Sequence, residues 1–224
     1  MTIPEREGFD VKLFSYDSAF SQHAMNLAAS CWLNLLWMLC SLPVVTVGAA
    51  TTALYAVTLK LAEGEDGHLT RRFFRALRDN FRQATVLWLI VLGAGLFLAV
   101  DGYIAWRLRA SSTGAPAVFW TLLLALIIAA ALAWAIVLAY VFPLTASVVN
   151  SSAAMLKNAF LIGTHYLFCT ILIFAIHFAM FFVAVRLFTP VLIFGEGLCA
   201  LLSSHFLAPV IASCSYVPSD GGAA

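Results

Sequence analysis

The sequence predicts an all-α protein, a polytopic bundle of about six transmembrane helices. Of its 224 residues, 63% are hydrophobic and only 10% are charged, whereas soluble domains carry roughly 45–50% and about 25%. A soluble domain of this size needs a charged, hydrated surface, so lipid must cover much of this chain. The apolar residues also form runs of about 20, the length at which a helix crosses a hydrocarbon core of about 30 Å.

The first 61 residues are expected to form a polar segment and two spans. Residues 1–17 are polar with mixed charges, and we expect them to lie at the membrane surface. From Ser18 to Leu59 there are 42 residues without Asp, Glu, Lys or Arg. That length fits two spans, at 24–42 and 45–61, with a tight turn at Pro43, because proline disfavours helix at the residue before it.

The second of these spans is polar for a helix that faces lipid. Thr51, Tyr55 and Thr58 follow i, i+4, i+7 spacing and therefore form one stripe. Two pairs of small residues, beginning at Gly48 and Ala49, are spaced four apart, which lets helix backbones approach closely. We favour a helix packed inside the bundle, and the alternative is that the stripe lines a solute path.

A charge-rich segment follows the second span. At 100° per residue, Arg71, Arg75, Arg78 and Arg82 share one helical face, and apolar residues such as Phe73 occupy the opposite face. This pattern predicts a basic amphipathic helix between spans two and three, lying in the plane of anionic lipid headgroups. Docking of a cytoplasmic partner is the alternative, and nucleic acid is not expected because no other basic surface supports it.

Four further spans are expected at 83–107, 117–141, 163–185 and 191–213. Pro143 is expected to mark the end of the fourth, followed by a short interfacial helix, and residues 214–224 are expected to form a flexible tail. Six spans place both termini on one side. Nine of the 12 Lys and Arg residues lie on that side, so the positive-inside rule predicts that both termini are cytoplasmic.

Ionisable side chains in the later spans are the other candidate functional residues. Ionisable groups within spans are functional hypotheses by default. Those near the outer span ends can reach interfacial water cheaply, so we favour pairing that ties spans three, five and six together. For the two deeper histidines we favour a core role over a proton path. The residues are Asp101, Arg107, Arg186 and Glu196 near the span ends, with His177 and His205 deeper.

No catalytic constellation is present in the sequence. It contains no phosphate-binding Gly-rich loop, no His-Glu-x-x-His and no Gly-x-Ser-x-Gly. The five cysteines show no Cys-x-x-Cys or Cys/His ligand spacing. We therefore assign no catalytic, cofactor-binding or metal-binding residue and do not expect an enzyme.

Three stretches of the chain are similar to a known family. They are NLLW at 34–37 with LPVVTVGAATTALY at 42–55, then FF at 73–74 with NFRQAT at 80–85, and more weakly LKNA at 156–159. In these stretches the chain resembles the YesL-like family of bacterial integral membrane proteins, catalogued as domain of unknown function 624. The resemblance extends over nearly the whole chain, and the run at 42–55 is its specific part.

The resemblance implies a multi-pass protein of the bacterial plasma membrane. Family members often lie in gene clusters with carbohydrate-uptake transporters and sugar-degrading enzymes, which implies an accessory or scaffold role in carbohydrate uptake or utilisation. The expected partners are the lipid bilayer and a sugar-uptake complex or membrane sensor, and self-association stays open. The alternative is a small transporter or channel, with a polar path lined by span two and the Asp101/Glu196 region.

Overall fold

The computed structural model describes residues 19–65, 67–186 and 192–215, and this part of the chain is helical without a strand. The expected polar segment 1–17 and residues 216–224 of the expected tail lie outside the described residues. The α-helices are α1 (Ala19–Cys40), α2 (Val47–Ala62), α3 (Leu69–Ser111), α4 (Ala115–Ser147), α5 (Ser152–His165), α6 (Leu167–Arg186) and α7 (Leu192–Ser215).

Among the described residues, five helical segments are long and apolar enough to cross a membrane. They are Val44–Ala62, Leu69–Ser111, Ala115–Ser147, Leu167–Arg186 and Gly195–Ser213. The apolar part of α1, Met25–Cys40, is shorter and extends about 24 Å at 1.5 Å per residue. The prediction of an all-α membrane helix bundle is confirmed.

Helix α2 is the centre of the bundle. It contacts α1, α3, α4 and α7, and 11 of its 16 residues are buried. Its most apolar window is 61% buried, whereas the corresponding window of α4 is 0% buried. The small and hydroxyl side chains of α2 therefore serve close helix packing, while the Leu- and Ile-rich surface of α4 is left for lipid.

The turn expected at Pro43 joins α1 to α2 through a short 3-10 helix, Val44–Thr46. The Thr46 hydroxyl lies 2.6 Å from the carbonyl oxygen of Cys40, on the other side of the turn. Trp88 of α3 donates its indole N–H to the carbonyl of Val44 at 2.7 Å. The turn is thus closed by its own residues and tied to α3.

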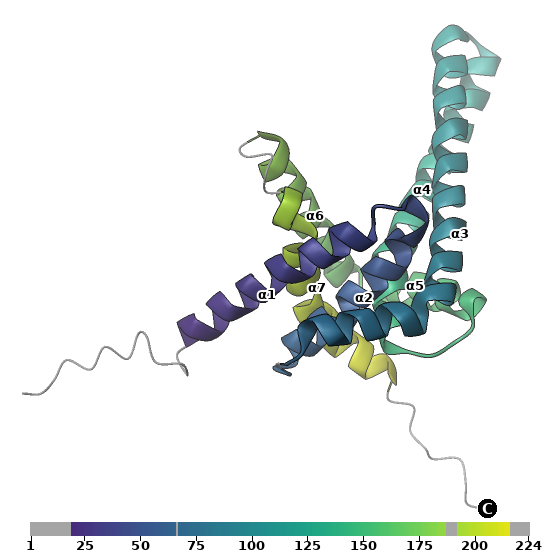
Figure 1. Cartoon of the computed structure of the whole chain (residues 1–224). Helices are drawn as coiled ribbons and strands as arrows, with labels where there is room; N and C mark the ends of the chain where they lie inside the picture. Colours follow the sequence, from purple (N-terminus) through teal and green to yellow (C-terminus); the bar gives the residue numbers. More distant parts are fainter. Residues whose placement is uncertain (1–18, 66, 187–191, 216–224) are drawn as a thin grey trace, which may run out of the picture.

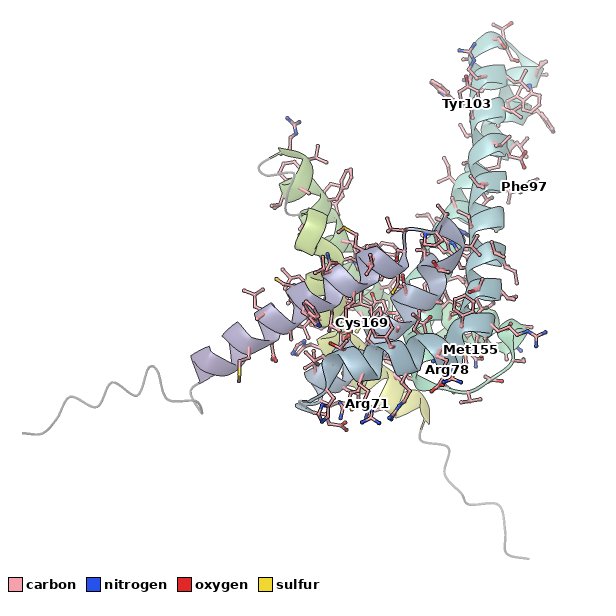
Figure 2. All side chains as sticks on the ribbon, in the orientation of Figure 1. Arg71, Arg78, Phe97, Tyr103, Met155 and Cys169 are labelled. Atoms are coloured by element: carbon pink, nitrogen blue, oxygen red, sulfur yellow. The ribbon has the colours of Figure 1, made fainter. Side chains whose placement is uncertain are left out.

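The amphipathic segment and the third span form one continuous helix, α3. The helix changes direction: the part with Arg71 and Arg78 crosses the foot of the bundle, and the part with Phe97 and Tyr103 rises beside α4 (Figures 1 and 2). The expected interfacial helix therefore exists as the first limb of α3. The second limb and α4 rise beyond the turn between α1 and α2 (Figure 1).

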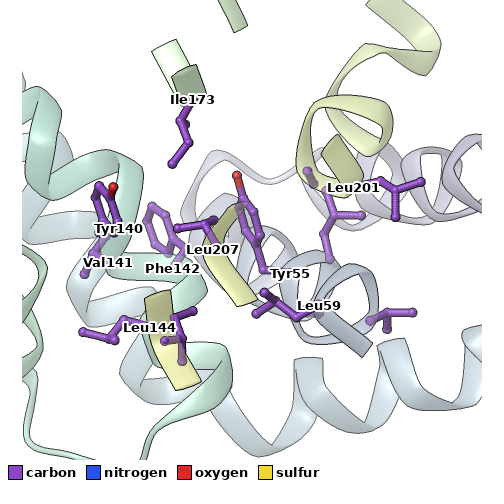
Figure 3. Close-up of a cluster of buried hydrophobic side chains, with 14 of the residues drawn as sticks. Tyr55, Leu59, Tyr140, Val141, Phe142, Leu144, Ile173, Leu201 and Leu207 are labelled. Atoms are coloured by element: carbon purple, nitrogen blue, oxygen red, sulfur yellow. The ribbon is translucent and has the colours of Figure 1, made fainter. Parts of the chain in front are cut away.

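Helix α4 continues past the residue expected to end it. Pro143 lies inside the helix, which ends at Ser147, so that boundary prediction was wrong. Proline costs a helix one backbone donor and crowds the preceding turn, yet Pro143 is buried and its carbonyl accepts from the Ser147 hydroxyl at 3.0 Å. Its neighbours Tyr140 and Phe142 belong to the apolar core that also includes Tyr55 of α2 (Figure 3).

Candidate functional site

A cavity of about 340 Å³ beside α2 brings together four of the polar residues singled out in the sequence. Its walls come from α1, α2, α3, α4, α6 and α7. The polar residues at the cavity are Thr51, Tyr55, His177 and Glu196. The other lining residues are apolar or aromatic: Trp37, Val47, Trp88, Leu138, Ala139, Phe142, Ile173 and Phe174.

Thr51 and Tyr55 reach the cavity because they lie one turn apart on the same face of α2. The Thr51 hydroxyl accepts a hydrogen bond from the indole N–H of Trp37 at 3.0 Å. Tyr55 is almost wholly buried, and its hydroxyl points toward Ile173 of α6 (Figure 3). One face of α2 therefore supplies two hydroxyl groups to a mostly apolar site.

The close packing of α2 on α3 places Trp88 at the cavity wall. A Cβ added to Gly48 would lie 2.4 Å from the Cβ of Trp88 and 2.7 Å from the carbonyl oxygen of Ala84. Only glycine allows the two backbones to come this close. The ring of Trp88 then lies 6.1 Å from that of Phe142, measured between centroids.

His177 of α6 and Glu196 of α7 bring the ionisable groups. The Nδ1 atom of His177 lies 2.8 Å from the carbonyl oxygen of Ile173. A carbonyl can only accept, so Nδ1 donates and Nε2 is the acceptor in the neutral ring. The described part of the chain contains no group of three or more His, Cys, Asp and Glu side chains that could hold a metal ion.

Two candidates of the inner bundle lie outside the cavity. Thr58 belongs to the same stripe as Thr51, but one turn beyond Tyr55, where its hydroxyl accepts from Ser204 of α7 at 2.9 Å. The Nδ1 atom of His205 lies 2.9 Å from the carbonyl of Leu201, one turn earlier in α7, and its side chain is exposed. Thr58 therefore joins two helices, whereas the hydrogen bond of His205 stays within its own helix.

Three further candidates do not line the cavity. Asp101 is half-buried on α3, Arg107 is exposed on the same helix, and Arg186 is exposed at the end of α6. The ion pairs of the described residues are confined to the segment from Lys60 to Arg72. The structure therefore does not bring Asp101 and Glu196 into one site.

Arg71, Arg75, Arg78 and Arg82, the arginine face, lie on the first limb of α3, and all four are exposed. Figure 2 shows Arg71 and Arg78 at the foot of the bundle. The neighbouring Arg72 instead pairs with Glu65, with 3.5 Å between the charged atoms. The arginine face is thus a separate charged surface, and none of its four residues lines the cavity.

Apart from Tyr55, the aromatic residues of the cavity are functional candidates that the sequence did not indicate. Trp37 lies in a stretch that carries the family resemblance, yet nothing in its spacing separates it from a core residue. Trp88, Phe142 and Phe174 lie in apolar runs, and no sequence pattern distinguishes them from the apolar residues around them. Asn34 was also missed: its side-chain oxygen accepts from the backbone N–H of Gly197 at 2.7 Å and joins α1 to α7.

Comparison with known proteins finds similarity to a family model and to a curated protein. Residues 31–102 match a family model described as "Protein of unknown function, DUF624". The chain is 33% identical over 128 residues to "Uncharacterized protein YesL" of Bacillus subtilis (strain 168), a match that covers 55% of each protein. Over the matched residues the chain is thus similar to the YesL-like DUF624 family. The resemblance seen in the sequence is thereby confirmed.

The match to YesL spans about half the length of that curated relative. The DUF624 segment includes the α1, α2 and α3 walls of the cavity, among them Trp37, Thr51, Tyr55 and Trp88. His177 and Glu196 lie beyond that segment. No solved structure matches the chain.

Proposed function

We propose that this integral membrane protein is a non-enzymatic accessory or scaffold component of the bacterial plasma membrane, associated with carbohydrate uptake or utilisation. The resemblance to the YesL-like family supports the carbohydrate context. The arginine face carries the accessory role, because its four side chains are exposed and take no part in the ion pairs found among the described residues. With both termini cytoplasmic, this face lies at the cytoplasmic surface. There an acidic patch of an uptake complex or sensor would be electrostatically complementary to it.

Charge reversal of the arginine face tests this role. The variant with Arg71, Arg75, Arg78 and Arg82 all changed to Glu should lose the subunits of a carbohydrate-uptake complex that the parent retains in a mild-detergent pull-down. Like charges then repel the partner. The matched control reverses Arg107 and Arg109, which are exposed at the other end of α3. Retention of the same subunits by the fourfold variant, inserted at normal levels, contradicts the proposal and leaves anionic lipid as the ligand of this face.

A second candidate function is a small transporter, favoured by hollows at both ends of α2. Besides the cavity at Thr51 and Tyr55, a hollow of about 270 Å³ is lined by Leu59, Lys60 and Glu63 among others. Tyr55 and Leu59 are one helical turn apart, and both are buried. Leu207 of α7 is buried in the same core cluster (Figure 3). In alternating access a binding site opens to each side of the membrane in turn, and the two hollows beside α2 would be the two openings.

Flux measurements on the purified protein alone in liposomes test this second function. Proton flux and the uptake of labelled monosaccharides are the readouts. Glu196→Gln should lower flux at least ten-fold, because Glu196 is the carboxylate at the cavity. Asp101→Asn is the matched control, since Asp101 is the other acid within a span and does not line the cavity. Flux equal to that of protein-free liposomes, or flux unchanged by Glu196→Gln, contradicts a transport role.

A further inference from the structure

We propose that the cavity beside α2 binds a small organic cation, a quaternary or protonated amine with apolar substituents, held by Glu196 and an aromatic wall. This inference rests on the second proposed function in taking the cavity as a ligand site, and it names the ligand class. It does not require that the ligand be moved across the membrane. The argument depends on the walls, the charge and the hydrogen-bonding groups of the cavity.

The walls are the first part of this argument. Five aromatic side chains from five different helices line the cavity: Trp37, Tyr55, Trp88, Phe142 and Phe174. The indole N–H groups of the two tryptophans are already used, by Thr51 at 3.0 Å and by the carbonyl of Val44 at 2.7 Å. The tryptophans therefore have no hydrogen-bond donor left for a ligand, and they can contact it only through the apolar ring. Ring faces carry negative electrostatic potential and attract cations, most strongly in tryptophan.

The charge of the cavity is the second part. Glu196 lines it, and no Lys or Arg is among its lining residues. The ion pairs found among the described residues join Lys60 to Glu63 and Glu65, and Arg72 to Glu65, all outside the cavity. His177 is the nearest basic group, and no ion pair links it to Glu196 in the described structure. A carboxylate in an apolar site is costly unless positive charge compensates it. His177 is the basic residue among those that line the cavity, and a cationic ligand would place a further positive charge beside Glu196.

The hydrogen-bonding groups argue against other ligand classes. A sugar needs many donors and acceptors around its hydroxyl groups, whereas Thr51, Tyr55, His177 and Glu196 are the polar residues of a wall otherwise apolar. An anion would meet a carboxylate and aromatic ring faces, and both repel negative charge. A volume of about 340 Å³ lies at the small end of ligand pockets. One cationic centre with a compact apolar group therefore matches the site.

Equilibrium binding to the full-length protein in lipid nanodiscs tests this inference. Benzyltrimethylammonium is the cationic probe, with neutral benzyl alcohol and anionic benzenesulfonate as ligands of related shape. We expect saturable binding of the cation with an affinity at least ten-fold above that of either control ligand. This comparison uses the unmodified protein, so it does not depend on the folding of any variant. Equal affinity for benzyl alcohol or benzenesulfonate, or no saturable binding of the cation, overturns the proposal.

Substitutions then locate the site. Glu196→Gln should weaken cation binding at least ten-fold and Trp88→Leu several-fold. Asp101→Asn and Trp106→Leu should leave it unchanged, since neither residue lines the cavity. Binding unaffected by Glu196→Gln in a protein of normal thermal stability also overturns the proposal. Cation binding without flux would support the ligand class and refute transport. A Glu196-dependent flux of another solute without cation binding would support transport and refute the ligand class.

Discussion

Gly48 shows how much of this bundle depends on single atoms. The backbone of α2 meets α3 at Gly48, where a methyl group would come within 2.4 Å of the Cβ of Trp88. The carbonyl of Ala84 would be 2.7 Å away. Neither neighbour is the end of a flexible side chain, so neither can move without moving α3. The position of Trp88, and with it one wall of the cavity, therefore depends on the absence of a side chain at residue 48.

We expect Gly48→Ala to destabilise the protein by about 1–3 kcal/mol, the usual cost of overpacking a close interface. Gly93→Ala is the matched control, because nothing lies within 4 Å of a Cβ at that position of α3. Alanine there should be neutral or stabilising by up to about 1 kcal/mol, owing to its higher helix propensity. Unfolding by denaturing detergent in mixed micelles measures both. Equal stability of the two variants would show that α2 and α3 are not held as the structure has them.

Only some of the polar residues of the cavity could be predicted from the sequence. Thr51 and Tyr55 follow from helical spacing, which correctly placed them on one face. The same spacing also included Thr58, which does not line the cavity. Helical spacing shows which face a residue lies on, but it does not show how far along the helix a cavity extends. His177 and Glu196 meet through the packing of α6 on α7, and nothing in either run signals the other. The aromatic wall was beyond prediction, since Trp and Phe in apolar runs occur equally in cores and at lipid.

At the scale of elements, the charge pattern and the lengths of the apolar runs predicted which helices form better than they predicted where each helix ends. The 42 uncharged residues from Ser18 to Leu59 correctly indicated two helices with a turn at Pro43. Pro143 was misjudged because proline ends a helix only when its missing donor and its ring are not accommodated. The arginine pattern indicated a helix on a surface, but periodicity cannot show that this helix continues into the next span.

The topology of the whole molecule remains a prediction with a direct test. With both termini cytoplasmic, the turn between α3 and α4 faces outward and the arginine face inward. In a background with its five native cysteines replaced, Thr113→Cys should react with a membrane-impermeant maleimide on intact cells. Arg78→Cys should react only after the cells are permeabilised. Both parent residues are exposed, and the cysteine-free parent is the control. The opposite labelling pattern would invert the molecule and place the arginine face outside.

The helices of this bundle differ greatly in length, and this difference bears on how the cavity meets water. Helix α2 has 16 residues and α4 has 33, which correspond to about 24 Å and about 50 Å. A bilayer that matches the long hairpin of α3 and α4 is too thick for the short hairpin of α1 and α2. Such hydrophobic mismatch is relieved by local thinning of the bilayer. We expect the membrane to dip over Pro43, so that water reaches the cavity near Glu196 from a shallow depression rather than through a long pore.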